Sequence, residues 1–354
     1  MSEYVRLLTQ EGERVEHPDY DVALSPEQLR GMYRDLVIVR RIDREGVTLA
    51  RQGELSMWVP LLGQEAAQIG SARALAPGDM AFPSYREHGV LWCRGMDPLR
   101  LFAFFRGVTL GDWDPRECGC HLYTIVVGGQ VLHATGYAMG IQRDHTDDAV
   151  IVYFGDGATS QGDVNEAFSW AAVFNVPVVF FCQNNRWAIS QPVERQSKAP
   201  LYRRSHGFGF PGIQVDGNDV LACHAVTAQA LEHARRGRGP VLVEARTYRM
   251  DAHTTSDDPS RYRSDKEVSE WQQKDPIKRM RMYLTKGRLA DDEFFDTVDA
   301  EAERIGAEAR KRCVDLPDPV PLEMFDHVYT APHPLLAEER DQFAGYLDSF
   351  LDQR

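Results

Sequence analysis

The feature that most constrains the fold is a strand–helix–strand unit near the middle of the chain. Residues 149–154, AVIVYF, form a short apolar run that ends at a glycine, which is typical of a buried strand. A second apolar run over 177–183 predicts another strand. Between the two runs, apolar residues at helical spacing predict a helix that is capped by Ser160. The expected buried stripe consists of Val164, Ala167, Phe168, Ala171 and Phe174. Such a unit crosses over right-handed and leaves its two strands parallel.

Helical and strand-like stretches separated by glycines continue to alternate from about residue 60 to 245. This alternation predicts an α/β fold with a central, mostly parallel sheet flanked by helices. Another strand is expected at 240–244. The sequence Ser-Pro-Glu-Gln at 25–28 combines a serine cap, an early proline and a capping-box glutamine, and predicts a helix that reaches about Gly53.

The chain divides into three parts by composition. Residues 1–24 form a polar N-terminal arm that is too thin for a core, and 25–264 carry the α/β pattern. Residues 265–354 form a charged, helical C-terminal extension, which we expect to pack on the same domain and on partner subunits. Within it, the proline-broken stretch 315–334 is expected to lie as an extended strap over a neighbouring surface.

Charge and composition exclude several classes of protein. The formal net charge of −13 argues against a nucleic-acid binder, because phosphate backbones favour Lys and Arg. About 18 apolar residues never run together and the start shows no signal-peptide pattern, so we expect no membrane association. Six cysteines in a chain of this length do not form a disulfide scaffold, and we expect a cytoplasmic protein.

Polar side chains follow both strands of the central unit. Asp156 stands between Gly155 and Gly157 directly after the first strand, and Asn184 and Asn185 follow the second. If the two parallel strands are neighbours, their ends lie about 5 Å apart at the same edge of the sheet. Carboxylate and amide oxygens suit Mg²⁺, and the glycines let the backbone approach a bulky anion. Taken alone, the aspartate is better explained as a turn former and the asparagines as ordinary loop residues; the two motifs together favour a ligand site.

At this point the sequence resembles a known family. A Gly-Asp-Gly, a helix, a strand and then Asn-Asn form the diphosphate-anchoring motif of thiamine-diphosphate enzymes. The stretches GQEAAQIGSARAL, FPSYREHGV, GDGATSQGD, QNNRWAISQPVERQ, PGIQVDGNDV and TYRMDAHTTSDDPSRYRS extend the resemblance over nearly the whole chain. The chain is similar to the alpha subunit of the decarboxylating component of 2-oxo acid dehydrogenase complexes. The resemblance implies a thiamine-diphosphate-binding fold in which Asp156, Asn185 and the carbonyl of Trp187 hold Mg²⁺.

The resemblance also implies the other contacts to thiamine diphosphate. Tyr85 and Arg86 follow an expected strand and match a pair that binds the diphosphate, a role that suits a bidentate guanidinium and a hydroxyl. Ile125 and Val127 match positions whose backbone meets the aminopyrimidine ring. The full set of expected cofactor-binding residues is Tyr85, Arg86, Ile125, Val127, Gly155, Asp156, Gly157, Ala158, Asn185 and His253.

His253 matches the active-site histidine of the family, so we expect it to be the catalytic residue of this chain. A neutral imidazole can give or take a proton near pH 7, and the resemblance implies that it stabilises the substrate carboxylate and assists acyl transfer to lipoamide. Residues 254–258 resemble a loop that orders when cofactor binds. Mitochondrial relatives carry a regulatory phosphoserine there, whereas this chain has Thr254, so the same regulation is not assumed.

Two departures from the family pattern bear on specificity and metal binding. Cys118, Cys120 and His121 are three potential metal ligands, but no partner cluster occurs at zinc-type spacing. Relatives also have a longer linker in this region, which puts any monovalent-cation site in doubt. Val59 replaces a histidine that is common in pyruvate-specific relatives. Together with Met57 it suggests a larger, more apolar pocket, so branched-chain 2-oxo acids are favoured over pyruvate or acetoin.

The family keeps the glutamate that activates the cofactor on a separate beta subunit. The resemblance therefore implies a heterotetramer of two alpha and two beta chains, which decarboxylates a small 2-oxo acid and transfers the acyl group to a lipoylated acyltransferase. Two other classes remain as alternatives. A nucleotide-dependent oxidoreductase is disfavoured because no Gly-x-Gly-x-x-Gly follows a strand. A structural subunit without cofactor is disfavoured by the intact Asp156, Asn185 and His253.

Overall fold

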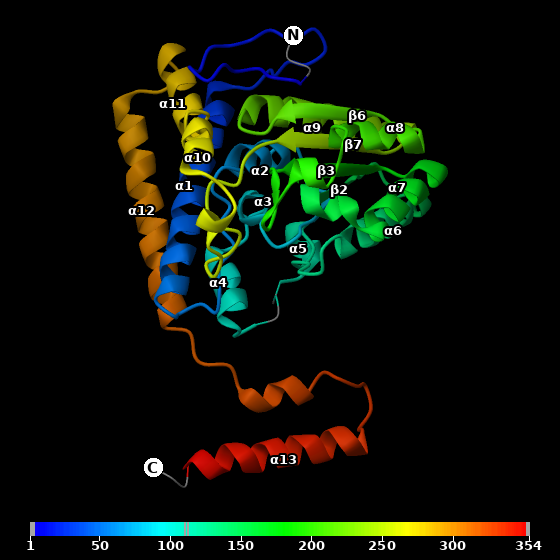
Figure 1. Cartoon of the computed structure of the whole chain (residues 1–354), viewed down its shortest axis with the longest axis vertical. Helices are drawn as coiled ribbons and strands as arrows, with labels where there is room; N and C mark the ends of the chain where they lie inside the picture. Colours follow the sequence, from blue (N-terminus) through cyan, green and yellow to red (C-terminus); the bar gives the residue numbers. More distant parts are fainter. Residues whose placement is uncertain (1–3, 110, 112, 352–354) are drawn as a thin grey trace.

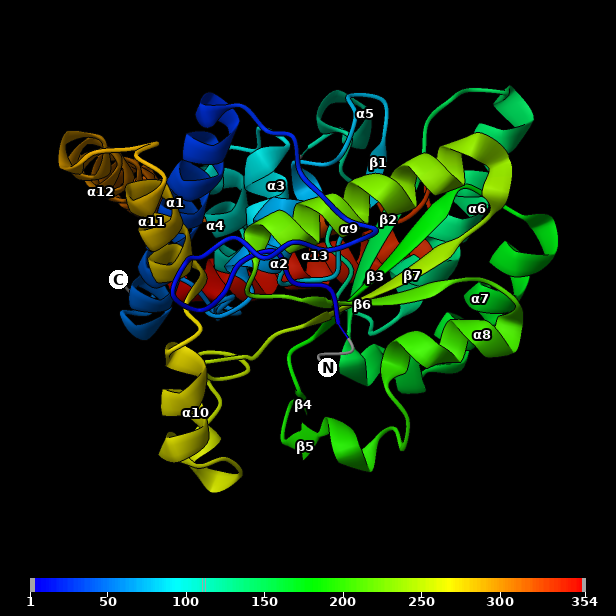
Figure 2. The same ribbon diagram turned by 90° about the horizontal axis from the view of Figure 1, so that it is seen from above.

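A sheet of five parallel strands forms the centre of the molecule, in the order β1-β2-β3-β7-β6 (Figures 1 and 2). The structure is a computed structural model and describes residues 4–109, 111 and 113–351. The strands are β1 (Met80–Phe82), β2 (Val150–Gly155), β3 (Val178–Asn184), β6 (Gly212–Asp216) and β7 (Val241–Arg246). A separate antiparallel pair joins β4 (Trp187–Ala188) to β5 (Gln191–Pro192). The predicted α/β fold with a parallel central sheet is confirmed.

Helices cover both faces of the sheet and extend beyond one side of it. The longer ones are α1 (Pro26–Arg51), α2 (Glu65–Ala72), α4 (Pro98–Arg106), α6 (Gly129–Asp144), α7 (Gly162–Phe174), α9 (Val220–His233), α10 (Asp265–Gln272), α11 (Pro276–Lys286), α12 (Asp292–Val314) and α13 (Pro334–Leu351). Short helices are α3 (His88–Cys93), α5 (Pro115–Cys118) and α8 (Arg204–Phe208). Helix α9 packs on β3, β6 and β7 and contacts α2, whereas α6 packs on β1, β2 and β3 and contacts α7 (Figure 2).

Alternation of side chains along β2 builds two apolar cores. Val150, Val152 and Phe154 point into the core shared with α6 and α7, and Ile151 and Tyr153 point into the core shared with α1, α2 and α9. All five side chains are fully buried. Because a strand presents successive residues to opposite faces, an uninterrupted apolar run is what a strand covered on both faces requires.

Helix starts were predicted with mixed success. Ser25 caps α1 in a complete capping box with Gln28, as the sequence predicts. The cap at Ser160 is wrong, because residues Asp156–Ser160 form a 3-10 turn and α7 begins two residues later with Gln161 at its N-cap position. Phe174 is also not part of the buried stripe; it is half exposed and stacks on Trp170 with 5.3 Å between ring centroids.

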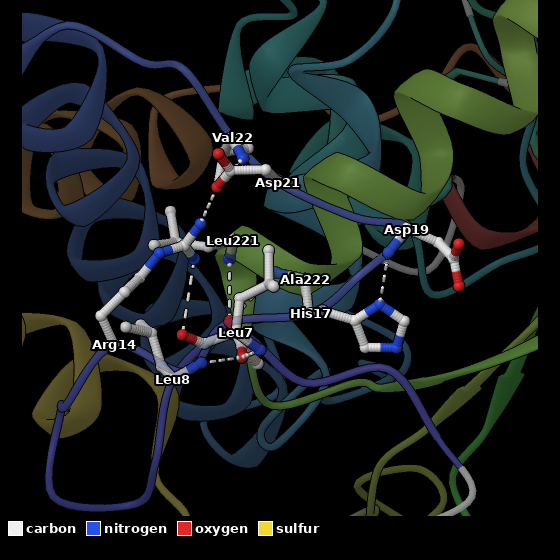
Figure 3. A network of polar contacts seen from close by, with 10 residues as sticks. Leu7, Leu8, Arg14, His17, Asp19, Asp21, Val22, Leu221 and Ala222 are labelled. Atoms are coloured by element: carbon white, nitrogen blue, oxygen red, sulfur yellow. Dashed lines mark hydrogen bonds and ion pairs between the residues drawn. The ribbon is translucent and has the colours of Figure 1, made fainter.

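The N-terminal arm packs on the edge strand β6 of the same chain. Val5 pairs with Val215 in a parallel bridge, and Leu7 and Leu8 are fully buried. One carboxylate joins the arm to α9: Asp219 Oδ2 accepts from the backbone N–H of Leu7 at 2.7 Å and of Leu8 at 2.6 Å (Figure 3). Its other oxygen accepts from the first N–H groups of the helix, at 3.0 Å each, and so caps it. The arm is therefore fixed by a buried, charged hydrogen-bond acceptor.

The C-terminal part behaves differently before and after residue 314. Helices α11 and α12 pack along α1, whereas the segment from 315 onwards leaves the body of the molecule and ends in α13 (Figure 1). A 3-10 turn at Pro321–Phe325 interrupts the extended strap expected at 315–334. Phe325 contacts Phe343 of α13 with 6.0 Å between ring centroids. None of the helices in the described ranges is long and apolar enough to cross a membrane.

Candidate active site

The carboxyl ends of β2 and β3 border a cavity of about 200 Å³. These strands are immediate neighbours, and Gly155 pairs with Gln183 at their ends. The predicted site residues that line the cavity are Tyr85, Arg86, Val127, Gly155, Asp156, Gly157, Ala158, Asn185, Trp187 and His253. They come from positions up to 168 residues apart, since the strand ends and the loops after β1 and β7 all open at one edge of the sheet.

Asp156 provides a buried negative charge at the cavity wall. Its side chain is 1% exposed, and burial raises the pKa of its carboxyl to about 6, against the lowering effect of nearby hydrogen-bond donors. One oxygen accepts from Gln196 Nε2 at 3.1 Å. Across the described residues, no Lys or Arg lies within ion-pair distance of this carboxylate. A buried carboxylate without an ion-pair partner is suited to a metal ion.

Asn185 and Trp187 follow β3 in a tight turn that depends on Arg186. The backbone of Arg186 has φ +73°, a left-handed conformation that reverses the chain between its two neighbours. Asn185 Oδ1 accepts from Trp187 N at 3.1 Å, and the carbonyl of Trp187 accepts from Arg249 Nη1 at 3.1 Å. Both oxygens keep a second lone pair, so both can serve as ligands of a cation.

Glycine occupies the positions on either side of Asp156 for two different structural reasons. A Cβ at Gly157 would lie 2.7 Å from the Cβ of Ala188 in β4, so only glycine allows this close packing. A Cβ at Gly155 would meet no atom within 4 Å, because this position faces open space beside the cavity. Gly155 is therefore the position where the backbone can approach a bulky ligand.

Arg86 is a buried cation on another wall of the cavity. It is 5% exposed, and it donates to the carbonyl of Pro60 and, at 3.1 Å, to the carbonyl of His253. Its Nη2 also lies 3.1 Å from His253 Nδ1. These contacts leave two of the five guanidinium N–H groups for a ligand, and the described part of the chain offers no ion-pair partner to Arg86. A buried guanidinium of this kind fits an anion such as a diphosphate.

The contact with Arg86 fixes the state of His253. A guanidinium can only donate, so Nδ1 is the acceptor and the ring proton resides on Nε2. Burial and then the positive charge of Arg86 lower the pKa of His253 to about 3. The imidazole is therefore neutral near pH 7 and offers an N–H donor. The ring of Tyr85 packs edge-on against it, with 6.2 Å between centroids.

The loop that follows His253 is held in place by hydrogen bonds to Trp58 and by hydrogen bonds among its own residues. The backbone N–H of Thr255 donates to the carbonyl of Trp58, and the backbone N–H of Trp58 donates to the hydroxyl of Thr255, at 3.0 Å each. Asp257 accepts from the backbone N–H of His253 at 2.8 Å and from the hydroxyl of Tyr262. Thr254 contacts Ser256 through its hydroxyl at 2.9 Å.

Ile125 and Val127 lie in irregular chain before α6 and are 56% and 43% exposed. Val127 borders the cavity, but Ile125 is not among the lining residues. Met57 and Val59 also do not line it; Val59 is buried, and its carbonyl lies 2.9 Å from His88 Nε2. The sequence argument that these two side chains widen a substrate pocket therefore finds no support in the cavity of this chain.

Cys118, Cys120 and His121 do not converge. The thiol of Cys118 contacts the carbonyl of Cys120 at 3.4 Å, and the ring of His121 stacks on Phe82 with 4.7 Å between centroids. Within the described ranges, no group of three or more His, Cys, Asp or Glu residues is arranged to hold a metal ion. The oxygen atoms around Asp156 come instead from one carboxylate, one amide and one backbone carbonyl.

Sequence reasoning missed the polar residues that surround the predicted ones. The cavity is also lined by Gln64, Ser84, Glu87, Gly128, Gln130, Phe154, Gln161, Gln183, Ala188 and Ile189. Gln64 and Glu87 lie inside the stretches GQEA and SYREHG, so their membership of characteristic stretches was the available signal. Both side chains contact Gln183, and the spacing of residues in the sequence does not predict these contacts.

Comparisons with known proteins identify the family of this chain. The family model described as dehydrogenase E1 component matches residues 33–321. The chain is 45% identical, over 98% of its length and 94% of the relative, to proteins named 3-methyl-2-oxobutanoate dehydrogenase subunit alpha from two strains of Mycobacterium tuberculosis. It is 38% identical, over 92% of its length and 95% of the relative, to the pyruvate dehydrogenase E1 component subunit alpha of Acholeplasma laidlawii.

A further relative, the pyruvate dehydrogenase E1 component subunit alpha of Bacillus cereus, is 39% identical over 85% of this chain and 81% of its own length. Both the family model and the relatives span the strand ends that form the cavity. The chain therefore belongs to the dehydrogenase E1 component family, as an alpha-type member.

Proposed function

We propose that this chain is the alpha subunit of a branched-chain 2-oxo acid dehydrogenase, which decarboxylates 2-oxo acids oxidatively and transfers the acyl group to the lipoyl group of an acyltransferase. The observation that carries the proposal is the presence, in one cavity, of a buried carboxylate and a buried guanidinium that each lack an ion-pair partner among the described residues. A ligand that brings both a divalent ion and a diphosphate satisfies both groups. The 45% identity to relatives named for 3-methyl-2-oxobutanoate supports the substrate class.

Enzymes of this family depend on thiamine diphosphate and a divalent metal ion, normally Mg²⁺. When bound, thiamine diphosphate supplies the electron sink that decarboxylation of a 2-oxo acid requires. In our proposal Asp156, Asn185 and the carbonyl of Trp187 hold the metal ion. Arg86 and Tyr85 bind the diphosphate, with Gly155 and Ala158 in backbone contact. The oxygen-rich donor set and the open space at Gly155 fit this arrangement.

We propose that His253 is the catalytic residue of this chain. Its neutral ring holds a proton at Nε2, which can be donated to a substrate carboxylate or carbonyl oxygen as charge develops. Arg86 holds the ring through Nδ1, and Asp257 holds its backbone, so the donor is oriented before substrate arrives. Val127, and Ile125 beside it, would border the aminopyrimidine side of the cavity.

Alpha subunits of this family work with a beta subunit and with a lipoyl-bearing acyltransferase. We propose a heterotetramer of two alpha and two beta chains with the cofactor at their interface, because the carboxylate that activates the cofactor lies on the beta chain in the family pattern. The chain alone is then inactive. All six cysteines are free thiols, which is what a reducing cytoplasm predicts.

The test is reconstitution with the beta subunit, Mg²⁺ and thiamine diphosphate, followed by decarboxylation assays on 3-methyl-2-oxobutanoate and pyruvate. We expect a higher kcat/KM for the branched substrate and no turnover by the alpha chain alone. A preference for pyruvate would instead assign the chain to the pyruvate dehydrogenase type. Relatives named for that enzyme are 38–39% identical to this chain. Turnover by the isolated chain would overturn the two-subunit proposal.

A further inference from the structure

A continuous line of side-chain hydrogen bonds runs along the wall of the cavity from Glu87 to Asn185. Gln183 Nε2 donates to Glu87 Oε1 at 2.6 Å, and Gln64 Nε2 donates to Gln183 Oε1 at 2.9 Å. Asn185 Nδ2 in turn donates to Gln64 Oε1 at 2.8 Å. The four side chains come from the loop after β1, the end of β3 and the start of α2. The line connects a carboxylate to an amide that we propose as a metal ligand.

Each link in this line has only one consistent direction. Glu87 Oε2 accepts from the backbone N–H of Ser84 at 2.7 Å and from its hydroxyl at 2.8 Å, and a backbone N–H can never accept. The carboxylate thus presents an acceptor to Gln183, whose amide must turn its NH₂ towards Glu87. The carbonyl of Gln183 then faces Gln64, with a second donor from Gln68 Nε2 at 3.2 Å.

The same logic continues to Asn185. The NH₂ of Gln64 donates to Gln183, so its carbonyl oxygen faces Asn185. Asn185 must therefore donate from its own NH₂ to this oxygen. Asn185 Oδ1 is consequently directed to the other side, where the N–H of Trp187 donates to it at 3.1 Å. A flipped Asn185 amide would set two donors against each other at Trp187 and two acceptors against each other at Gln64.

Burial keeps the four side chains in these orientations. Glu87 is 2% exposed, Gln64 and Gln183 are 1% exposed, and Asn185 is 6% exposed, so water does not replace a lost partner. Groups that are paired in a low-dielectric interior and cannot turn to solvent keep the orientation that their neighbours impose.

We propose that Glu87, acting through Gln183 and Gln64, fixes which way the amide of Asn185 faces and thereby keeps its oxygen available to the metal ion. Gln64, Gln183 and Glu87 are positioning residues in this proposal, not ligands. The inference rests on the proposed role of Asn185 in metal binding. It assigns a function to polar residues that surround the cavity without being part of the family's diphosphate motif.

The test uses the complete complex of alpha and beta chains, with thiamine diphosphate and Mn²⁺ as a paramagnetic substitute for Mg²⁺. Free Mn²⁺ is measured by electron paramagnetic resonance. Gln64→Leu removes the acceptor for Asn185. Glu87→Gln keeps the shape of Glu87 but must present its single carbonyl to Ser84, so its NH₂ meets Gln183 and reverses the line. Each substitution is expected to raise the dissociation constant of Mn²⁺ about 10- to 100-fold, the range seen for groups that support metal ligands.

A double-mutant cycle separates the relay from a simple loss of charge. Once Gln64→Leu has cut the line, Glu87→Gln should add no further loss, so the double variant should match Gln64→Leu alone. Glu87→Asp, which keeps an acceptor-only group, should recover part of the affinity. Gln142→Leu, the same change at an exposed glutamine of α6, is the matched control and should leave Mn²⁺ binding unchanged.

The outcomes are distinct. If the two changes multiply in the double variant, Glu87 acts by its charge alone and the relay is wrong. If the single variants bind Mn²⁺ as the parent complex does, the relay is wrong as well. If the parent complex itself binds no Mn²⁺ with thiamine diphosphate, the proposed function fails first and this inference falls with it. Circular dichroism of each variant complex verifies that the fold is retained.

Discussion

The cavity at the strand ends and the C-terminal segment after residue 314 leave opposite kinds of groups without partners. At the cavity, two buried charges lack an ion-pair partner within the described part of the chain: Asp156 is 1% exposed and Arg86 is 5% exposed. In the C-terminal segment the groups without cover are apolar. Val320, Met324, Val328, Tyr329, Leu335, Tyr346 and Phe350 are each between 49% and 62% exposed.

The unpaired buried charges and the exposed apolar side chains require different kinds of partner. Buried charges that face a small cavity are satisfied by a compact, charged ligand, since a cation and an anion can enter where a protein surface cannot. Large apolar side chains on a segment that stands away from the body are satisfied by another protein surface. The first region is therefore organised around a cofactor, and we expect the second to be organised around a subunit. Four experiments test this contrast, from the largest expected effect to the smallest.

Removing the negative charge at the cavity should have the most extensive effect, because cofactor binding and activity are both expected to fall. Asp156→Asn keeps the shape of the side chain but takes away the charge that would hold the metal ion. In the complex with the beta subunit we expect thiamine diphosphate and Mg²⁺ to bind at least about 100-fold more weakly, and activity to fall with them. Calorimetric titration measures the affinity. Asp163→Asn, an exposed acidic residue in the first turn of α7, should change neither quantity.

Replacing the proposed proton donor should separate chemistry from binding. His253→Ala is expected to lower kcat about 10²- to 10⁴-fold while thiamine diphosphate affinity stays close to that of the parent complex. His253→Gln should retain more activity because its amide can place an N–H near the position of Nε2. Since the pKa of His253 is lowered to about 3, its ionisation should cause no change in rate between pH 5 and 8. His206→Ala, at an exposed histidine, serves as control.

A buried carboxylate away from the cavity shows what burial does without a ligand. Asp43 is 3% exposed and accepts from Trp58 Nε1 at 2.8 Å and Leu61 N at 3.0 Å, and burial raises its pKa to about 7. Between about pH 4 and 7 the folded chain holds this proton and the unfolded chain does not. The free energy of unfolding therefore falls as the pH rises through this window, by up to about 4 kcal/mol from this group.

Asp43→Asn should remove this slope, because its amide keeps both accepted hydrogen bonds and cannot ionise. We expect the variant to match the parent chain near pH 4 and to be the more stable of the two at pH 8. Urea unfolding at pH 4 to 8 measures the difference. An unchanged slope would show that Asp43 is ionised in the folded chain at neutral pH. Asp296→Asn, at an exposed site on α12, should leave the slope as it is.

The smallest effect on the chain itself is expected from the C-terminal helix. Tyr346 packs on Phe350 with 4.9 Å and on Phe343 with 6.3 Å between ring centroids, and Tyr346 and Phe350 remain 58% and 50% exposed. Replacing both by serine should change the free energy of unfolding of the alpha chain by no more than about 0.5 kcal/mol each, as is usual for surface sites. Assembly with the beta subunit, measured by sedimentation, should nevertheless weaken about 10-fold. Equal assembly of this variant and of Gln342→Ser would contradict a docking role for α13.

Local patterns in the sequence determined the elements of the fold. The capping box at Ser25 follows from four consecutive residues, and the strands at 150–155 and 178–184 with their parallel pairing follow from one strand–helix–strand unit. That is why the presence of Asp156 and Asn185 at one edge of the sheet could be predicted. The cap at Ser160 could not, because a 3-10 turn competes with the helix start and spacing alone does not decide between them.

Contacts between distant residues were decided only by the tertiary structure. Arg86 and His253 are separated by 167 positions, and Gln64 and Gln183 by 119. The neutral state of His253 and the direction of the Asn185 amide depend on these pairs, because a pKa and an amide orientation are set by the groups that surround a side chain in space. Sequence periodicity determines which face of an element is buried. The crossing of several elements at one edge of the sheet determines which polar groups meet there.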